Sequence, residues 1–411
     1  MDPAFASLLI FAATYFGIAL GTFPGLALDR TGVALLGAIA MVVAGALSTD
    51  EAVRAIDTST ILLLYGLMVL SAQFRLWGFY THVALGILRF MEKPRKFLAI
   101  LMGVSALFSA VLANDIVCLA FTPVLAVSLV RARLNPLPFL IGLTCASNIG
   151  SAATIIGNPQ NMLIGQIGGL DFGKFTLWCA PPSLLSLAAA YGIILAMYSG
   201  NWDAPYTTYS EVHAEWPPYN RYQSAKGLVL TMLLMALFLT SVPREFTALC
   251  VAAILMCSRK TATRSILGLV DWHLISFFCA LFIVMEGVIK YGLPQQGILW
   301  MASNGLDINA PLALSGVSLV LSNIVSNVPA VLLLLKNMDL TATDNLYLLS
   351  LVSTFAGNLI TIGSIANLIT IEQAKAHGIN IGFMEHARTG VPVAAASCLI
   401  AIGWFFVVHV R

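Results

Sequence analysis

Residues 144–161 read TCASNIGSAATIIGNPQN and lie inside a strongly apolar part of the chain. The stretch contains Gly150, Gly157 and Pro159, which are residues that weaken or break an α-helix. Within a bilayer, irregular backbone survives only where it lines a cavity, because unpaired backbone groups are costly there. The stretch therefore predicts a broken membrane helix whose open turn binds a solute or an ion.

A second interrupted stretch lies near the other end of the chain. Residues 354–368 read TFAGNLITIGSIANL, and AGN at 356–358 matches ASN at 146–148. Two corresponding interrupted segments are the best sequence indication of a transporter's binding site. We therefore expect both stretches to contribute to one site.

The composition is that of a membrane protein. Of the 411 residues, 59% are hydrophobic and 10% are charged, whereas soluble chains carry roughly 25% charged residues. Apolar runs long enough to cross a bilayer recur along the chain. No cleavable signal peptide is evident, and there is no Walker motif, so ATP hydrolysis by this chain is not expected. The seven cysteines show no CxxC or CxxH spacing, which argues against a zinc site or a disulfide framework.

The two halves of the chain repeat. Residues 57–70 resemble residues 271–284 at an offset of 214, and residues 108–114 resemble residues 321–327 at an offset of 213. The two interrupted stretches match at an offset of 210. Such near-constant spacing predicts two copies of one unit.

Counting the crossings predicts how the copies are oriented. If each hairpin enters and leaves on one side, each half crosses the membrane five times, and the second half is inverted relative to the first. We therefore expect an all-α polytopic membrane protein with two inverted repeats, each with about five transmembrane helices plus a re-entrant hairpin and a broken helix. The expected parts are a first repeat at 1–198 with its hairpin at 96–131 and broken helix at 136–170, a cytoplasmic linker at 199–223, and a second repeat at 224–411 with its hairpin at 310–337 and broken helix at 343–376.

Polar residues at the hairpin interruptions are the first candidates for function. Asn114 and Asp115 lie deep in apolar sequence, where an ionisable residue is expected to be functional. Asp115 can hold a cation such as sodium or carry the coupling proton, or it can merely cap a half-helix. The second hairpin has Ser326-Asn327-Val328 at the matching place, without a carboxylate. We therefore assign the coupling role to Asp115.

The broken helices supply the other candidates. Half-helix N-termini attract anions and freed carbonyl groups attract cations, although ordinary hydrogen bonding between helices is the alternative. Beyond a sodium ion at the hairpin tips, no metal and no cofactor are expected. The full candidate set is Asn114, Asp115, Ser147, Asn148, Gly150, Ser151, Thr154, Asn158, Ser326, Asn327, Gly357, Asn358, Thr361, Ser364 and Asn367.

Other charged and titratable residues are expected to be structural. Glu286 and Lys290 are four positions apart near a helix end, which predicts a local ion pair. Arg30 is expected to anchor the topology at the membrane surface. The histidines fall in loops or at segment ends and are expected to be interfacial; they are His82, His213, His273, His377, His386 and His409.

Several of these motifs resemble one family. The pattern ANDx5FTP at 113–123 resembles the first hairpin of the arsenite permease branch of the ion-transporter superfamily. The segment SNIGSAATIIGNPQN resembles the broken helix of the related sodium/proton antiporters, and IGSIANL at 362–368, followed by Arg388-Thr-Gly, resembles the arsenite permeases. The resemblance implies an elevator-type secondary transporter and a homodimer. Dicarboxylate members carry Ser-Asn-Thr at both hairpin tips, and the different tips here argue against sodium-coupled dicarboxylate transport.

Three transport functions remain open at this point. The first is proton-coupled efflux of arsenite, antimonite or a similar small inorganic solute. The alternatives are a sodium/proton antiporter and sodium-coupled anion uptake. An intramembrane enzyme would need a nucleophile–base pair or a metal cluster, and the sequence shows neither. The expected partners are the bilayer and the solute, with no nucleic acid, and a separate ATPase partner is left open.

The distribution of basic residues predicts the topology. Of the 21 Lys and Arg residues, 15 fall on one side of the expected membrane and six on the other, and the richer side is cytoplasmic by the positive-inside rule. The six are Arg54, Lys174, Arg244, Lys290, Lys336 and Arg411. We therefore expect a multi-pass plasma membrane protein, such as one of a prokaryotic inner membrane, with both termini outside.

This topology can be tested by cysteine labelling. With the native cysteines replaced, a single cysteine placed in 131–134 or 199–223 is expected to react with a membrane-impermeant reagent only after the cells are opened. Labelling of the 199–223 segment from outside intact cells would contradict the assignment.

Overall fold

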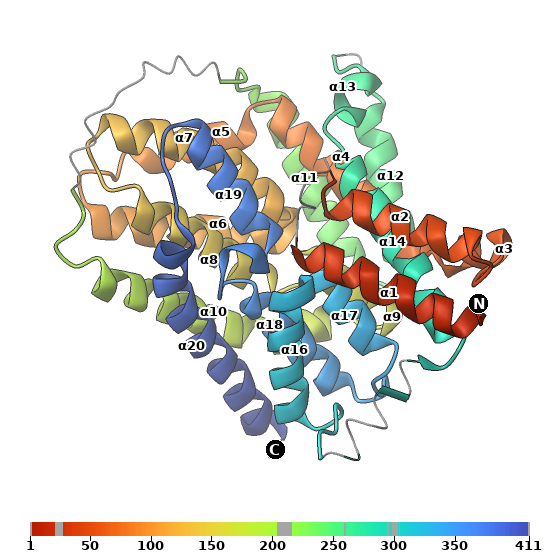
Figure 1. Ribbon diagram of the computed structural model, residues 1–411. Helices are drawn as coiled ribbons and strands as arrows, with labels where there is room; N and C mark the ends of the chain where they lie inside the picture. The colour runs from red at the N-terminus through yellow and green to blue at the C-terminus, as the bar shows by residue number, and fades with distance from the viewer. Residues whose placement is uncertain are drawn as a thin grey trace.

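The computed structural model describes residues 2–20, 28–203, 216–258, 260–293, 296–297, 303 and 305–409, and these are helical without a β-strand (Figure 1). Only an isolated bridge between Leu134 and Asp203 has β geometry in the described part of the chain. The middle of the predicted linker, 204–215, lies outside the described residues, as do Arg259, Arg411 and His213.

The first half consists of ten helices in the described residues. They are α1 Pro3–Leu20, α2 Arg30–Val43, α3 Thr49–Ala55, α4 Thr58–Leu76, α5 Phe79–Leu88, α6 Pro94–Leu112, α7 Asn114–Arg131, α8 Leu137–Ser151, α9 Pro159–Ile167 and α10 Phe172–Met197. Helices α6 and α7 form the first hairpin, and α8 and α9 form the first broken helix.

The second half follows the same order. Its described elements are α11 Arg221–Leu237, α12 Arg244–Met256, α13 Thr263–Leu267, α14 Trp272–Ile289, α16 Pro311–Val325, α17 Asn327–Leu335, α18 Thr343–Ala356, the 3₁₀ turn η1 Thr361–Gly363, α19 Ile365–Ala376 and α20 Phe383–His409. Helices α16 and α17 form the second hairpin, and α18 and α19 form the second broken helix.

Seven described helices are long and apolar enough to cross a membrane, namely α1, α4, α6, α7, α10, α14 and α20. Shorter apolar helices, α2, α5, α8 and α16, supplement them. The predicted fold class, an all-α polytopic membrane protein with two inverted repeats, is confirmed.

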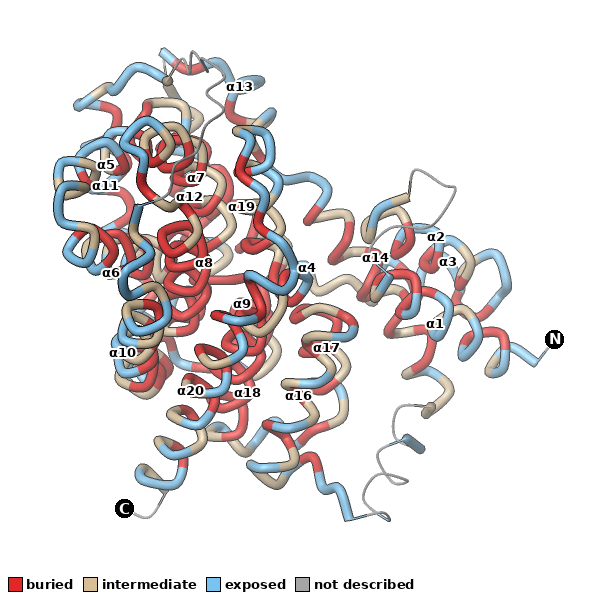
Figure 2. Tube along the Cα trace, turned by 60° about the vertical axis from the view of Figure 1, so that its left-hand side comes forward, coloured by how far each residue is buried: buried red, intermediate tan, exposed pale blue. Residues whose placement is uncertain are grey.

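The two repeats interlock. Helix α4 of the first half packs against α12 of the second, while α14 of the second half packs against α2 of the first. In the same reciprocal way, α7 packs against α19 and α17 packs against α9. Figures 1 and 2 show α1–α3 with α14 at one end of the molecule, and α6 and α10 at the other. Each repeat therefore completes its packing with helices from the other repeat.

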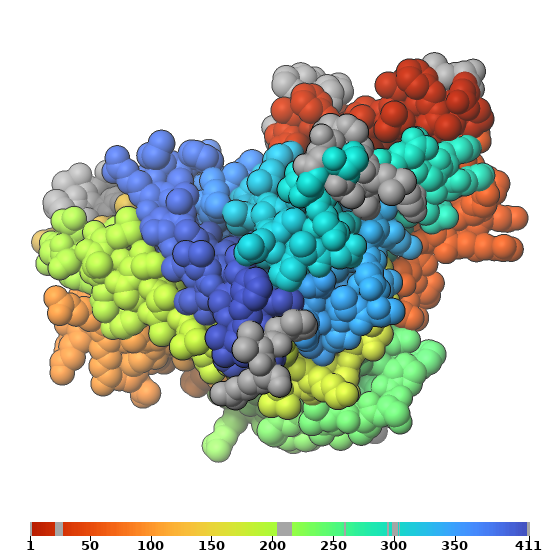
Figure 3. Space-filling model, turned by 90° about the horizontal axis from the view of Figure 1, so that it is seen from below, coloured from red at the N-terminus to blue at the C-terminus, as the bar shows by residue number. Residues whose placement is uncertain are grey.

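The broken helices occupy the protected centre. Every residue from Pro138 to Ser151 of α8 is buried, as is every residue from Asn345 to Ala356 of α18. Figure 2 shows this burial as a continuous red trace along α8, surrounded by helices with exposed faces. Outside them, α20 lies between α10 and α16, as the view from below shows in dark blue (Figure 3). Irregular backbone between the half-helices is thus kept away from lipid.

Each hairpin turns through one residue with left-handed backbone. Ala113 links α6 to α7 with φ of 64°, and Ser326 links α16 to α17 with φ of 78°. This conformation is rare for a residue with a side chain and costs about 1–3 kcal/mol. Ser326 lies 213 positions after Ala113, the spacing of the hairpin repeat, so both halves carry an equivalent strained tip.

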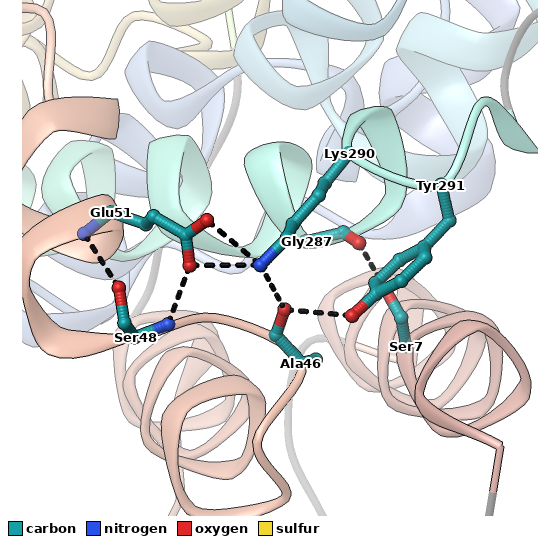
Figure 4. A network of polar contacts seen from close by, with 7 residues as sticks. All are labelled: Ser7, Ala46, Ser48, Glu51, Gly287, Lys290 and Tyr291. Atoms are coloured by element: carbon teal, nitrogen blue, oxygen red, sulfur yellow. Dashed lines mark hydrogen bonds and ion pairs between the residues drawn. The ribbon is translucent and has the colours of Figure 1, made fainter.

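The predicted ion pair between Glu286 and Lys290 is wrong. Lys290 instead pairs with Glu51 of α3 at 2.8 Å and also donates to the carbonyl oxygen of Ala46 at 3.3 Å (Figure 4). The reason is that a capping box with Ser48 fixes Glu51 at the start of α3, beside the end of α14. Figure 4 also shows Tyr291 bonded to Ala46, so several contacts join the α2–α3 connection to the end of α14.

This ion pair makes the junction sensitive to acid. Lys290 and Ser48 lower the pKa of Glu51 from 4.5 to about 2, because they stabilise its charged form. Since the pKa is lower in the folded state, the contribution to stability is complete above pH 4.5 and is lost as the pH falls towards about 2. We expect Glu51→Gln to lower the unfolding temperature of the protein in detergent slightly near pH 6, and less as the pH approaches about 3.

The matched control is Glu286→Gln, which removes a carboxylate one turn from Lys290 but leaves the ion pair intact. It should not reproduce the pH-dependent difference. Equal behaviour of the two variants across the titration would contradict the assignment of Glu51 as the partner.

Candidate functional site

Four helix N-termini converge on one small cavity. Its lining comes from the first residues of α7, α9, α17 and α19 and the residues just before them, namely Asn114, Asp115, Pro159, Gln160, Ser326, Asn327, Val328, Ser364 and Ile365. The cavity measures about 20 Å³, which is room for roughly one water-sized group. A helix N-terminus carries a partial positive charge, because its first N–H groups have no partner within the helix. The lining residues include no lysine or arginine, so the partial positive charge at this cavity comes from helix ends, opposite the Asp115 carboxylate.

Asn148 is the centre of the hydrogen-bond network behind this cavity. Its Nδ2 donates to Oδ1 of Asn358 at 2.8 Å and to Oδ1 of Asn367 at 3.3 Å. Its Oδ1 accepts from Nδ2 of Asn114 at 3.0 Å and from Oγ of Ser364 at 3.0 Å. One amide therefore connects the first hairpin, the first broken helix and the second broken helix.

A second asparagine spans the break in each broken helix. Nδ2 of Asn161 donates to the carbonyl oxygens of Ser151 and Thr154 at 3.2 and 2.9 Å. Nδ2 of Asn367 donates to the carbonyl oxygens of Gly357 and Ile360 at 2.7 and 3.1 Å. In both cases the acceptors lie ten and seven positions earlier. The carbonyl groups freed by the break are thus paired by a side chain from the following half-helix.

These two bridges correct the register of the repeat. Asn367 lies 206 positions after Asn161, so the broken helices do not correspond at the expected offset of 210. Asn148 lies inside α8, whereas Asn358 follows the end of α18. The two residues share a site because they hydrogen-bond directly, and not because they occupy equivalent positions.

The hairpin tips contact the broken helices in comparable ways. The backbone N–H of Asn114 donates to the carbonyl oxygen of Gly157 at 3.1 Å. The hydrogen-bond partners assign Asn327 the amide orientation in which its nitrogen donates to the carbonyl oxygens of Gly363 and Ser353, both at 3.1 Å. A Cβ on Gly357 would lie 3.1 Å from the Asn327 amide, so glycine there permits the close approach of the second tip.

Two buried polar atoms, one in the cavity lining and one in the Asn148 network behind it, have no partner among the described residues. They are Oδ1 of Asn114, which is an acceptor, and Nδ2 of Asn358, which is a donor. Asn114 is 4% exposed and Asn358 is fully buried. An unpaired polar atom in such a place costs about 1–3 kcal/mol. A group that both donates and accepts hydrogen bonds would therefore satisfy these two atoms.

Asp115 lies between two cavities. It lines the small one and also a larger cavity of about 250 Å³, which we call the vestibule, bounded by α4, α7, α9, α19 and the segment before α14. The vestibule extends along α4 from Leu64 to Arg75. No hydrogen bond to the Asp115 carboxylate is found in the described part of the chain. The carboxylate is thus accessible from the vestibule and adjoins the central site.

The other predicted residues support the site from behind. Oγ of Ser147 lies 2.6 Å from Oγ of Ser109, and Oγ of Ser151 donates to the carbonyl oxygen of Asn148 at 2.8 Å. Asn158 caps α9 by accepting from the N–H of Asn161. Thr154, Gly150 and Thr361 do not line the small cavity: Thr154 bonds Ala110, Gly150 allows α6 to approach α8 and Thr361 lies in η1.

Two residues lie where the sequence reasoning did not expect them. His386, predicted to be interfacial, is 1% exposed in α20, and both ring nitrogens lack a partner among the described residues. Gly390, one turn later, leaves no room for a Cβ atom, which would meet the carbonyl oxygen of Asn358 and the His386 ring. Arg30, predicted to be a surface anchor, reaches the carbonyl oxygen of Ile362 at 3.5 Å. Charged residues are close to both positions in the sequence, so the local sequence did not indicate either placement.

Comparisons with known proteins agree with this architecture. The family model described as citrate transporter matches residues 8–346. The silicon efflux transporter LSI3 of Oryza sativa subsp. japonica is 28% identical over 97% of this chain and 98% of its own length. The putative transporter arsB of Dictyostelium discoideum is 25% identical over 92% of this chain and 87% of its own length. The YdaH transporter of Alcanivorax borkumensis has a similar fold, with a TM-score of 0.52 at 12% identity, covering 100% of this chain and 98% of the other.

The Asn148 network predicts a sharp effect of an isosteric change. Asn148→Asp supplies at most one donor where the amide supplies two, so the links to Asn358 and Asn367 cannot both form. We expect the initial transport rate in proteoliposomes to fall at least about tenfold, because a buried group left unpaired costs about 1–3 kcal/mol.

The matched control is Asn345→Asp. Asn345 is also buried and donates to one backbone carbonyl, that of Asn309, at the far end of α18. This variant should keep most of its activity. Wild-type rates for Asn148→Asp would show that the network is only packing.

Proposed function

This chain belongs to the citrate transporter family, and from that premise we propose that it exports a small hydroxylated metalloid such as arsenite or antimonite in exchange for protons. Membership of the family establishes a membrane transporter. The named function of one relative, silicon efflux, favours a metalloid over a tricarboxylate. Another relative is named only as the putative transporter arsB. The plasma membrane location, the external termini and a homodimer are parts of the same proposal.

The observation that carries the proposal is the cavity at the four helix N-termini. Helix N-termini favour the lone pairs of oxygen ligands. The cavity has a volume of only about 20 Å³, so the hairpins must move apart for any solute, and a solute of a few atoms would need a smaller opening than citrate. Charged side chains able to neutralise three carboxylates are missing from its lining. A small solute with several oxygen atoms fits these constraints best.

The unpaired atoms favour an uncharged hydroxylated solute in particular. Near neutral pH, arsenite is mainly As(OH)₃, whose hydroxyl groups both donate and accept hydrogen bonds. Oδ1 of Asn114, in the lining, can accept from one hydroxyl group, and Nδ2 of Asn358, behind the lining, would donate to another once the site opens towards it. A simple oxyanion would accept only, and would meet the negative charge of Asp115.

Asp115 then supplies the coupling. As a carboxylate it accepts a hydrogen bond from a hydroxyl of the solute, and as a carboxylic acid it no longer offers that acceptor to the same extent. Solute and proton therefore exclude one another at one residue, which is the requirement for exchange. The vestibule beside Asp115 gives the proton a route to this residue from one side.

Movement between the two sides requires the site to travel. We propose that the hairpins and broken helices move together as an elevator, because the Asn148 network ties the first hairpin to both broken helices and Asn327 ties the second hairpin to the second broken helix. Helices α2, α4, α12 and α14, which pack reciprocally, form the scaffold. The two strained hairpin tips would keep the site closed during the movement.

Sodium coupling is the alternative. Freed carbonyl oxygens of the broken helices are potential sodium ligands, but Asn161 and Asn367 already donate to four of them. Positive helix ends also oppose a bound cation. Both features weaken the sodium/proton antiporter and the sodium-coupled anion uptake as alternatives.

The proposal is tested by transport in proteoliposomes with Asp115→Asn. Asparagine keeps the shape but does not titrate, so we expect pH-driven transport of arsenite to fall at least about tenfold while arsenite exchange at equal pH continues. The wild type should respond to a pH gradient and not to a sodium gradient.

Other results would redirect the assignment. Sodium-dependent transport that Asp115→Asn abolishes would support the sodium alternatives. Wild-type behaviour of this variant under both gradients would reduce Asp115 to a helix cap. Absence of arsenite, antimonite and silicic acid transport by the wild type would overturn the substrate class.

A further inference from the structure

The vestibule has an uneven charge pattern. Of the residues that line it, only Arg75, Asp115 and Asp271 are charged, and its other walls are apolar apart from Ser71. Arg75 is in the last turn of α4, Asp115 is at the start of α7 and Asp271 precedes α14. Arg75 and Asp271 are exposed, whereas Asp115 is half-buried. Trp272, the neighbour of Asp271, packs against Tyr65, so Asp271 and Arg75 lie near different parts of α4 in the vestibule wall.

Asp271 has a structural role that its repeat partner shares. Its Oδ1 accepts from the N–H of Leu274 at 2.9 Å and so caps α14. Asp57 caps α4 in the same way, accepting from the N–H of Thr60 at 2.7 Å. Asp57 is not among the residues that line the vestibule. Capping therefore explains an aspartate at both positions, but only Asp271 shares a cavity with a hairpin carboxylate.

The second hairpin lacks the carboxylate that Asp115 supplies at the tip of the first hairpin. Val328 is the residue of the second tip that corresponds to Asp115 in the hairpin repeat. Asp57, the repeat counterpart of Asp271, therefore has no acidic residue at the second tip whose proton occupancy it could change. Of these two capping aspartates, Asp271 thus shares a cavity with a hairpin carboxylate, and Asp57 has no counterpart of Asp115 at the second tip.

We propose that Asp271 and Arg75 are positioning residues for coupling, which act in opposite directions on the proton occupancy of Asp115 across the vestibule. The proposal rests on the proton-coupled function argued above and adds two residues to it. A negative side chain facing the vestibule favours a proton on Asp115, and a positive one disfavours it. Behind the lining, Tyr80 hydrogen-bonds Ser71 and remains uncharged at working pH.

The first test compares pH profiles of transport. Asp271→Asn should shift the midpoint of the transport rate to lower pH, and Arg75→Gln should shift it to higher pH, each by roughly 0.3 to 1 unit. Asp57→Asn is the matched control, because asparagine caps helices as well as aspartate does. Asp57→Asn should leave the pH midpoint of the transport rate unchanged. Asp271→Glu, which keeps the negative charge, should show the wild-type pH profile.

The second test measures the charge of the vestibule without transport. Leu269 lines the vestibule and is half-buried, so Leu269→Cys places a thiol there. The exposed Cys250 and Cys257 and the half-buried Cys279 are first replaced by alanine. The thiol introduced by Leu269→Cys is then reacted with a cationic and with an anionic methanethiosulfonate. The ratio of the cationic rate to the anionic rate should fall severalfold with Asp271→Asn, rise with Arg75→Gln and stay constant with Asp57→Asn.

The two measurements separate two kinds of failure. If the labelling ratios change as expected but no solute is driven by a pH gradient, the proposed function is wrong and the coupling proposal falls with it. If proton-driven transport is found but Asp271→Asn and Asp57→Asn give the same midpoint, Asp271 is only a cap. Shifts of the same sign for Asp271→Asn and Arg75→Gln would also overturn the proposal.

Discussion

Backbone hydrogen bonding inside the membrane is the constraint on which the arrangement depends. Breaking two helices at the centre of the molecule exposes helix ends that lipid cannot satisfy. Asn161 and Asn367 pair freed carbonyl groups, and Asn158 and Ser364 each accept from one N–H group in the first turn of the second half-helices. Side chains thus satisfy part of each break, and the N-termini of both second half-helices line one small cavity. This is the cavity at which solute binding is proposed above.

The electrostatic character of the site follows from this arrangement. Because four helix N-termini meet there, their dipoles place partial positive charge at the cavity without any basic side chain in its lining. A single carboxylate, Asp115, then has a large influence, since no other charged side chain lines the cavity. The site can change its charge by one proton. A change of charge by one proton is consistent with the proposed exchange of a small uncharged solute for protons.

The sequence predicted the fold and the places where it is interrupted. Clusters of Gly, Pro and Asn in apolar surroundings identified both broken helices, and the Asn residues of the hairpins identified both tips. Asn114, Asp115, Ser326, Asn327 and Ser364 indeed line one cavity. These features are local, because they depend on which residues can leave a helix inside a membrane.

Features that depend on three-dimensional neighbours could not be predicted in this way. The predicted register of the broken helices was wrong because residues of similar type were aligned with one another. The equivalent hydrogen bonds of Asn161 and Asn367 give the structural correspondence. Lys290 forms its ion pair with Glu51 and not with Glu286, because packing places α3 at the end of α14. Burial of His386 likewise depends on the helices around α20.

The reciprocal packing of the halves has a consequence for how the chain is made. Helix α2 finds its partner α14 only after more than half of the protein has left the ribosome, and α4 must likewise wait for α12. Until then, the first-half helices can be inserted in the bilayer but cannot complete their packing. Packing can start within the first half, between α6 and α8, but it is completed late, and a truncated chain holding one repeat would reach the membrane without a finished fold. A fragment carrying the second repeat, supplied separately, would provide the missing surfaces.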